Sequence, residues 1–264
     1  ENRSDLCLST ARRGITQRDV DADGIVRHLH GSTSIDSTSN RYWRGEEYTG
    51  GGLNLILRPT PAWELSTDLS YSHTNRLDSE RMTRLRANQR DVNNAALPGI
   101  SSGATGYVDY DWDWHGEVPS VALAPNFDPT NWDAYTGAAR VTSSATENNH
   151  KIKAGRFDAS FMPESGFFTR IKGGVRASQA DYRLRDNTLV TDYDQRVAAD
   201  KAKIIAANQA CRAPFPQDDF MDAASGNTIS SWAYFDPDCL YQSFRGSLDS
   251  GLDPGFQDPN NVDI

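Results

Sequence analysis

The sequence lacks any long hydrophobic run. Apolar residues make up 37% of its 264 residues, and the mean hydropathy is -0.65. A transmembrane helix requires a run of about 18 or more apolar residues, so none is expected. The strands of a membrane β-barrel contain no such run either. A membrane location is therefore left open.

Positive charge is also scarce. The chain has 27 Lys and Arg against 36 Asp and Glu, which gives a net charge of -9. An acidic chain is poorly suited to nucleic acid, which we do not expect as a partner. The sequence also lacks a nucleophile elbow, a phosphate-binding glycine loop and an HExxH motif. We therefore expect no enzymatic activity and no cofactor.

The first residues, "ENRSDLCLST", provide neither the basic start nor the apolar stretch of a signal peptide. They also lack an initiator Met. We interpret the chain as a piece of a longer protein.

Cysteine is limited to three residues. Cys7 stands alone, whereas Cys211 and Cys239 share a polar, Asp-rich region. Three unrelated thiols are one interpretation, but we favour a loop disulfide between the last two in an oxidising compartment, with Cys7 unpaired.

Two segments alternate between apolar and polar residues, which predicts strands because successive side chains point to opposite faces. They form expected hairpins at about 51–76 and 149–182, with turns at Pro59–Pro61 and Pro163–Gly166. Across the second turn, Asp158 should face Arg170 or Lys172, with Phe161 meeting Phe167. The apolar odd positions are Leu53, Leu55, Leu57, Trp63, Leu65, Leu69, Tyr71, Phe157, Phe161, Phe167, Ile171 and Val175.

Long polar stretches at about 1–45, 77–148 and 183–264 are expected to be loops. Within them, "RLDSERMTRLRANQRD" is compatible with a short helix, and "QRVAADKAKIIAANQA" has helix-forming composition. Soluble domains rarely contain loops longer than about 15 residues. Short turns at one end and long loops at the other are typical of outer-membrane barrels.

The second face of the expected strands is charged, and aromatic residues cluster beside the short turns. Both features favour an antiparallel transmembrane β-barrel segment whose apolar face contacts lipid. The alternative is a soluble β-sandwich with aromatic core positions. The expected lumen-facing charges are Glu64, Asp68, Arg156, Asp158, Arg170, Lys172 and Arg176.

"GGLNLILRPTPAWELSTDLSYSHT" and "FFTRIKGGVRASQADY" resemble barrel strands of TonB-dependent outer-membrane receptors. "ACRAPFPQDDF" and "WAYFDPDCL", with Cys211 and Cys239, resemble a disulfide-bearing extracellular loop of some members. The resemblance implies an active transporter in a Gram-negative outer membrane, with a barrel of about 22 strands around a plug. It implies import of a scarce ligand, such as a siderophore or sugar, driven by the inner-membrane TonB complex. The plug and the closing C-terminal strand are not found, so the remainder of the receptor is an expected partner.

The stretch "DYDWDWHGE" interleaves acids with aromatics. Such a loop suits stacking and hydrogen bonding to a ligand, although a self-packed loop explains the pattern equally well. The expected ligand contacts are Trp112, Trp114, Trp132, Asp111 and Asp113.

Asp19, Asp21 and Asp23 match the start of a calcium-binding loop, but His30 stands where a bidentate Glu is required. A solvated acidic turn is the interpretation we favour. His28 and His30 lack an evident third ligand, so we expect no metal site.

Two other functions remain open. One is a passive outer-membrane porin, and the other is a secreted carbohydrate-binding β-domain that uses the Trp-rich loop.

Overall fold

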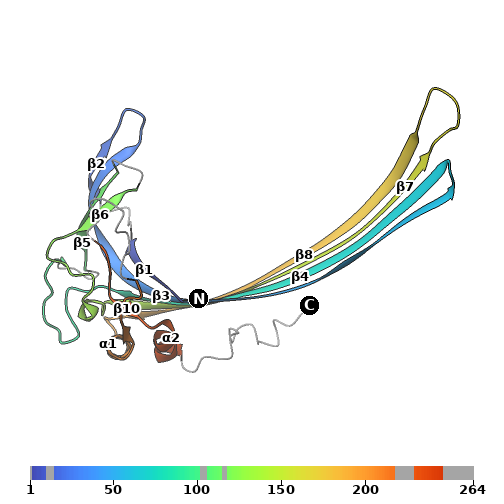
Figure 1. Cartoon of the computed structure of the whole chain (residues 1–264). Coiled ribbons are helices and arrows are strands. Elements are labelled where there is room, and N and C mark those ends of the chain that lie inside the picture. The colour runs from blue at the N-terminus through green and yellow to red at the C-terminus, as the bar shows by residue number, and fades with distance from the viewer. Residues whose placement is uncertain (1, 10–14, 102–105, 115–117, 218–228, 246–264) are drawn as a thin grey trace. The chain divides into compact units, whose positions relative to one another are not determined.

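The computed structural model describes residues 2–9, 15–101, 106–114, 118–217 and 229–245 (Figure 1). These residues form a mostly antiparallel β structure with two helices and one 3-10 turn. The elements are β1 (Asn2–Ser9), β2 (Ile15–Val20), β3 (Val26–Thr60), β4 (Trp63–Arg86), β5 (Val108–Asp113), β6 (Ser120–Leu123), η1 (Trp132–Ala134), β7 (Ala138–Phe161), β8 (Ile171–Asp194), α1 (Ala198–Ala210), β9 (Arg212–Ala213), β10 (Tyr234–Phe235) and α2 (Pro237–Arg245).

The main sheet has the strand order β6-β5-β3-β4-β7-β8, and β1 and β2 also pair with β3. The all-β class expected from the alternation is confirmed. Within the described ranges the sheet is open, because β8 does not pair with β6, and no closed barrel is formed. Neither helix in these ranges is long and apolar enough to cross a membrane.

The chain divides into two compact units, and the long strands β3, β4, β7 and β8 contribute to both. The first unit comprises Glu1–Tyr42, Glu80–Ser144 and Thr188–Ile264. The second comprises Trp43–Ser79 and Ala145–Asn187.

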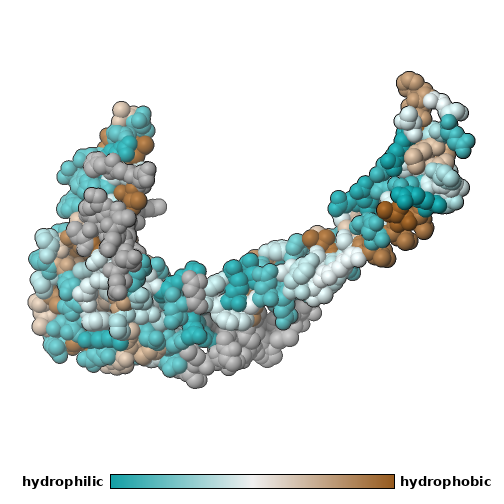
Figure 2. Space-filling model, viewed as in Figure 1, coloured by the Kyte–Doolittle hydropathy of each residue, from teal (hydrophilic) through white to brown (hydrophobic). Residues whose placement is uncertain are grey.

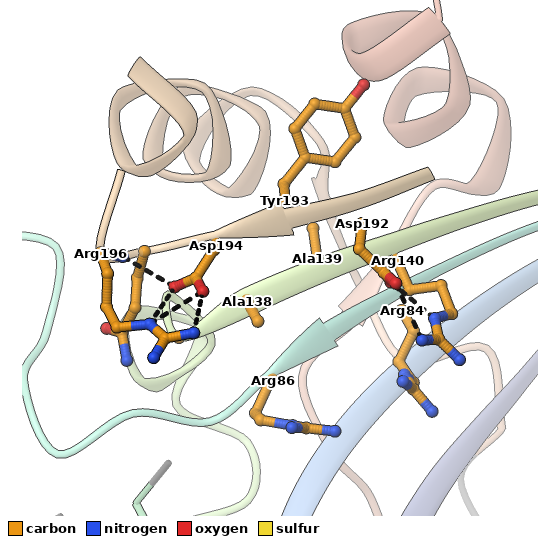
Figure 3. Close-up of a pocket in the computed structure, with 11 residues that line it drawn as sticks. Arg84, Arg86, Ala138, Ala139, Arg140, Asp192, Tyr193, Asp194 and Arg196 are labelled. Atoms are coloured by element: carbon orange, nitrogen blue, oxygen red, sulfur yellow. Dashed lines mark hydrogen bonds and ion pairs between the residues drawn. The ribbon is translucent and has the colours of Figure 1, made fainter. Parts of the chain in front are cut away.

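The first unit contains the hydrophobic core. Odd-numbered strand residues, among them Ile35, Leu85 and Val141, are fully buried in one cluster with residues of α1, α2 and β10. Tyr193 of β8 points toward the helices (Figure 3), and its ring lies 4.8 Å from that of Phe244 of α2. The helices thus cover the apolar face of these strands.

The structure corrects the prediction of a loop for the polar stretch before Arg41. Residues 33–40 are part of β3 and are buried on both faces. Ser37 on the core side donates to the carbonyl of Ala233, and Asp36 on the other side accepts from Arg86. Because hydrogen bonds satisfy buried groups such as Ser37 and Asp36, this part of the strand is stable without an apolar sequence.

The charged segment 77–86 is also strand, so the prediction of a loop there is wrong, and the short helix with which its sequence was compatible does not form. Burial alternates in this part of β4, with the odd-numbered residues Ser79, Arg81, Thr83 and Leu85 buried. Most of these inward residues are polar, which hid the period of two from sequence inspection.

Helix α1 forms where its composition predicted it. Cys211, directly after α1, and Cys239, within α2, form a disulfide. This confirms the predicted pairing. Cys7 is free. The disulfide links the two helices that cover the core.

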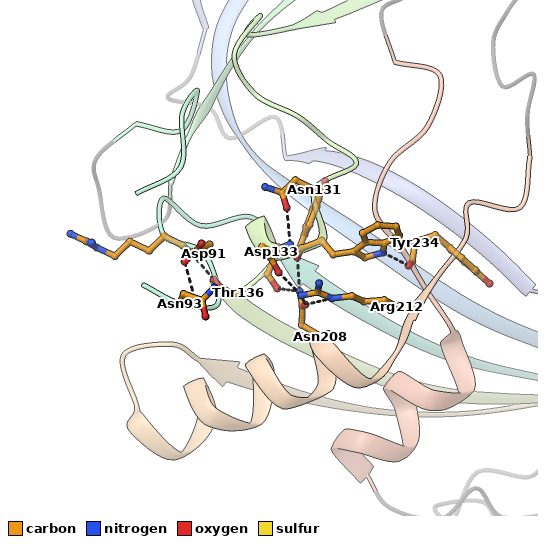
Figure 4. Close-up of polar contacts among 11 residues, drawn as sticks. Asp91, Asn93, Asn131, Asp133, Thr136, Asn208, Arg212 and Tyr234 are labelled. Carbon is orange, nitrogen blue, oxygen red and sulfur yellow. Dashed lines mark hydrogen bonds and ion pairs between the residues drawn. The ribbon is translucent and has the colours of Figure 1, made fainter. Parts of the chain in front are cut away.

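Buried polar contacts attach α1 to the turn at η1 (Figure 4). Asn208 is fully buried and donates to the carbonyls of Trp132 and Tyr135 at 2.7 and 3.1 Å. Arg212 donates to Asn208 and forms an ion pair with Asp133. The Trp132 carbonyl also accepts from the backbone N–H of Tyr135, so the bonds from Asn208 join α1 to a turn that is already closed.

The second unit is a sheet with two different faces. Leu53, Leu69, Phe157 and Val175 occupy odd positions and are exposed, Val175 by 72%. Hydrophobic residues reach the surface near the hairpin turns (Figure 2). Even positions instead line a polar cavity of about 390 Å³, formed by Asn54, Ser66, Asp68, Ser70, Ala154, Arg156, Asp158, Lys172 and Arg176 together with Gly155.

Both hairpins exist but are longer than the predicted 51–76 and 149–182. Their strands extend into the stretches 1–45, 77–148 and 183–264, which also contain the short strands and the helices. Sequence inspection missed these extensions because most of their inward positions are polar or small, with isolated apolar residues such as Ile35 and Leu85 between them.

The predicted tight turn at Pro163–Gly166 is part of a longer connection. Strand β7 ends at Phe161 and β8 begins only at Ile171, so Phe167 is not in the ladder. Phe167 is 94% exposed and contacts Phe168, whereas Phe161 packs on Trp63 with ring centroids 4.9 Å apart. The predicted Phe161–Phe167 pair is therefore wrong.

The register across this connection also differs from the prediction. A Cβ added to Gly174 would overlap the carboxylate of Asp158, so Asp158 lies against Gly174 and not opposite Arg170 or Lys172. Arg170 instead contacts Ser160 and Glu64. The shift involves an even number of residues, which keeps even positions on the charged face.

Candidate functional site

A charged cavity of about 300 Å³ opens on the strands of the first unit (Figure 3). It lies on the face whose even-numbered residues point away from the helices. Two ion pairs, Arg140 with Asp192 and Arg196 with Asp194, lie on opposite sides of Ala138. The full lining is Arg84, Arg86, Gly137, Ala138, Ala139, Arg140, Asp192, Tyr193, Asp194, Gln195 and Arg196.

Asp36 anchors the arginines at the base of this face. Its side chain is 1% exposed and accepts from Arg86 Nε at 2.8 Å and Arg86 Nη2 at 3.2 Å. Arg84 Nε lies 3.3 Å from the same carboxylate. The hydrogen bond that Arg86 donates to Asp36 raises the pKa of Arg86, so this guanidinium stays charged. One buried carboxylate is thus shared by two cations.

Arg140 forms a second two-bond pair, with Asp192, at 2.6 and 2.9 Å. The side chain of Asp192 is 60% exposed, and that of Arg140 is 43% exposed. The bond to Arg140 lowers the pKa of Asp192, with smaller contributions from Arg84 and Arg86. The pair is therefore fully ionised at neutral pH but open to solvent.

Asp194 and Arg196 form the ion pair at the other side of the cavity. Hydrogen bonds from the Arg196 side chain and backbone lower the pKa of Asp194 to about 2. Both residues are largely exposed, so this pair contributes little to stability.

The predicted aromatic residues Trp112 and Trp114 lie on or just after β5. Their rings are 6.1 Å apart in an edge-on arrangement, and Arg27 stacks over Trp114. Within the described part of the chain, the buried Trp114 Nε1 has no hydrogen-bond partner. The contact fits the self-packed interpretation, and a ligand role for the pair stays a prediction.

Trp132 is not beside these two residues. It lies on η1, and its Nε1 donates to the carbonyl of Tyr234 at 2.9 Å (Figure 4). Its ring packs against the hydrophobic core. The structure therefore gives Trp132 a role in packing.

Asp111 and Asp113 each contact a histidine of β3 across the β3–β5 ladder. His30 Nδ1 lies 2.7 Å from Asp111, and His28 Nδ1 lies 2.8 Å from Asp113. The bond to Asp113 raises the pKa of His28. The four side chains share one sheet face, but no metal-binding group is found among the described residues.

The acidic turn at Asp21 has a structural explanation. The Asp21 carboxylate accepts from the backbone of Asp23 and Ile25 and from Arg27 Nε. These bonds close the turn after β2, which fits the favoured interpretation of Asp19, Asp21 and Asp23.

The residues predicted to face a lumen do share the charged face of the second unit. Asp68, Arg156, Asp158, Lys172 and Arg176 line one cavity there. Glu64 pairs with Arg58 at 2.9 Å and with Arg170 at 3.3 Å, and Arg156 pairs with Asp158 at 2.6 Å. Their orientation toward a barrel lumen stays a prediction.

Sequence inspection missed the arginines of the first unit's cavity. Arg84 and Arg86 are two positions apart, and this spacing places both on one face of a strand. That signal was present but was assigned to a helix. The contact with Asp36 joins β3 and β4, so no local pattern reveals it.

Comparison with known proteins adds no relative. No protein-family model matches the sequence, and no curated protein matches it significantly.

Proposed function

We propose that this chain is a segment of an outer-membrane active transporter that imports a scarce extracellular ligand with TonB-coupled energy. In this proposal the second unit spans the outer membrane of a Gram-negative bacterium. The first unit contributes to the ligand-binding part.

The observation that carries the proposal is the two-faced sheet of the second unit. In residues 53–71 and 157–176, odd positions such as Leu69 and Val175 expose apolar side chains, whereas even positions such as Arg156 and Asp158 carry paired charges. Exposed apolar surface on this scale indicates a contact with lipid or another protein. Lipid is favoured because the charged face supplies the polar interior that an outer-membrane barrel requires.

Strand length is consistent with this proposal. From Trp63 to Tyr71, β4 rises roughly 26 Å at about 3.3 Å per residue. A tilted strand of this length covers the thin hydrocarbon band of about 25 Å in the outer membrane. The aromatic contact of Trp63 with Phe161 lies near the short turns, as an interfacial girdle requires.

The open edges of the sheet define the partners. Unpaired backbone groups are not tolerated in lipid, so further strands must close the sheet. We assign them to the remainder of the same receptor, together with the plug that the TonB complex pulls. Four of the predicted ligand contacts lie on or just after β5 and stay candidates in this proposal: Trp112, Trp114, Asp111 and Asp113.

A pair of lysine substitutions on β4 tests the lipid assignment. Leu69 and Ser70 are neighbours, both are exposed, and they point to opposite faces. In the full-length protein we expect Leu69→Lys to destabilise the membrane-inserted form by about 2 to 4 kcal/mol if the residue lies near the midplane. Ser70→Lys should have little effect. The measurement is the folded fraction in outer-membrane preparations, read by heat-modifiable electrophoretic mobility.

Equal assembly of both variants would contradict the proposal, because an exposed Leu in water tolerates Lys. A passive porin would also give unequal assembly. It differs in that uptake through it would continue after the proton-motive force is collapsed. A secreted carbohydrate-binding domain would stay soluble without detergent.

A further inference from the structure

We propose that the cavity at Arg84, Arg86 and Arg140 binds a small oxyanion, a carboxylate or phosphate. The inference names a ligand class for the proposed transporter and rests on that function for its biological role. The binding step itself depends only on the first unit.

The charge balance at this cavity leaves one positive charge. Three guanidinium groups, those of Arg84, Arg86 and Arg140, face two carboxylates. Asp36 pairs with both Arg84 and Arg86, whose Nε atoms lie 3.3 and 2.8 Å from its carboxylate oxygens. Asp192 serves Arg140. The chain as a whole carries -9, so this cluster is a local exception to its acidity.

Donors for a ligand are available on two of these arginines. Arg84 Nε lies 3.3 Å from Asp36, and among the described residues its terminal nitrogens donate no hydrogen bond, so they can bind another acceptor. Arg84 and Arg140 line the same cavity, and both act electrostatically on the Asp192 carboxylate (Figure 3). Their planar forks match the oxygens of a carboxylate or phosphate, which they bind through paired hydrogen bonds.

The Arg140–Asp192 pair is suited to exchange. Asp192 is 60% exposed, so its attraction for Arg140 is weakened by water. An incoming oxyanion can replace the Asp192 carboxylate with an equivalent acceptor. Asp192 therefore acts as a competitor for the ligand at this site.

Small residues give the ligand room. Gly137 and Ala138 line the cavity between the two ion pairs, and the cavity volume of about 300 Å³ accommodates a small organic anion. Gly137 lies close to the backbone, since an added Cβ would be 3.0 Å from the carbonyl of Ala87. Backbone packing therefore fixes the position of Gly137 at the cavity, whether or not a ligand is bound.

Calorimetric titration of the purified full-length protein in detergent tests the proposal. The probes are citrate, inorganic phosphate and glucose, an uncharged control that also represents a sugar ligand. We expect citrate, phosphate or both to bind, and the stronger of the two identifies the oxyanion class. Arg140→Gln and Arg84→Gln should each weaken binding about tenfold or more, as expected for a lost charge-assisted hydrogen bond.

Asp192→Asn should have the opposite effect and strengthen binding, because it removes the competing carboxylate. The matched control is Arg90→Gln, which removes the same charge from an exposed loop residue that donates to Asn94. It should leave binding within about twofold, since Arg90 does not line the cavity and the charge of an exposed side chain is screened by solvent. An unchanged circular dichroism spectrum verifies that each variant is folded.

The proposal is overturned if neither anion binds, if only glucose binds, or if Arg140→Gln and Arg90→Gln weaken binding equally. These outcomes are separate from those of the lysine substitutions on β4. A protein that inserts into the membrane but binds no oxyanion contradicts only the present inference. A protein that binds oxyanions but tolerates Leu69→Lys contradicts only the membrane assignment.

Discussion

Asp36→Asn should destabilise the first unit by about 3 kcal/mol, the lower end of the range for breaking a buried ion pair. Asp36 is almost fully buried and is held by Arg84 and Arg86, whose side chains are 29% and 25% exposed. The neutral amide leaves two guanidinium groups next to each other without a carboxylate. Because water partly reaches both arginines, we expect the loss of stability to lie at the lower end of the range for buried ion pairs.

The measurement is hydrogen exchange of β3 amides around Ile35 in the full-length protein, which should accelerate by about a hundredfold. Asp192→Asn provides the matched control. Asp192 holds Arg140 in the same two-bond geometry but is 60% exposed, so its loss should cost about 0 to 1 kcal/mol. Equal effects of the two substitutions would show that burial does not govern the strength of these pairs.

Replacing Cys211 and Cys239 together by Ser should allow α1 and α2 to separate far more often. The disulfide spans 28 residues, and the chain-entropy relation gives about 3 to 4 kcal/mol for closing such a loop. Lys203 of α1 donates to the carbonyl of Phe244 of α2, so cleavage after this residue requires the helices to open. Trypsin should therefore cut after Lys203 much faster in the double variant.

Cys7→Ser is the control for this experiment. Cys7 is free and lies 3.5 Å from the hydroxyl of Thr38, a contact that Ser preserves. Its cleavage rate should match that of the unmodified protein. If the double variant is cut no faster than the control, then the Lys203 contact and core packing, and not the disulfide, hold the helices.

Alternation predicted strands only where one face is apolar. Trp63–Tyr71 met that condition, and the structure places it within β4. The same strand continues to Arg86 with Ser79, Arg81 and Thr83 buried, and there the pattern failed. The inward face in this part is polar, and Arg81 stacks over the ring of Tyr241 there.

The sequence likewise indicated site residues that are close together in the chain, but not those that distant strands bring together. The sequence indicated Asp111 and Asp113 because they stand among aromatics in one short stretch. It gave no indication that His28 and His30 would pair with them from a distant strand. The Asp36 cluster was missed for the same reason, since side chains on β3 and β4 meet only after the sheet has formed.

The central claim, that the odd-numbered face of the second unit contacts lipid, is tested most directly by spin-label accessibility at Val175 and Arg176. Both residues are exposed neighbours on β8 with opposite directions. Single cysteines at these positions, in the full-length protein with Cys7→Ser, are labelled in reconstituted membranes. We predict that the label at position 175 collides mainly with oxygen, which concentrates in lipid, and the label at 176 mainly with a water-soluble nickel chelate. Equal nickel accessibility at both positions would contradict the claim.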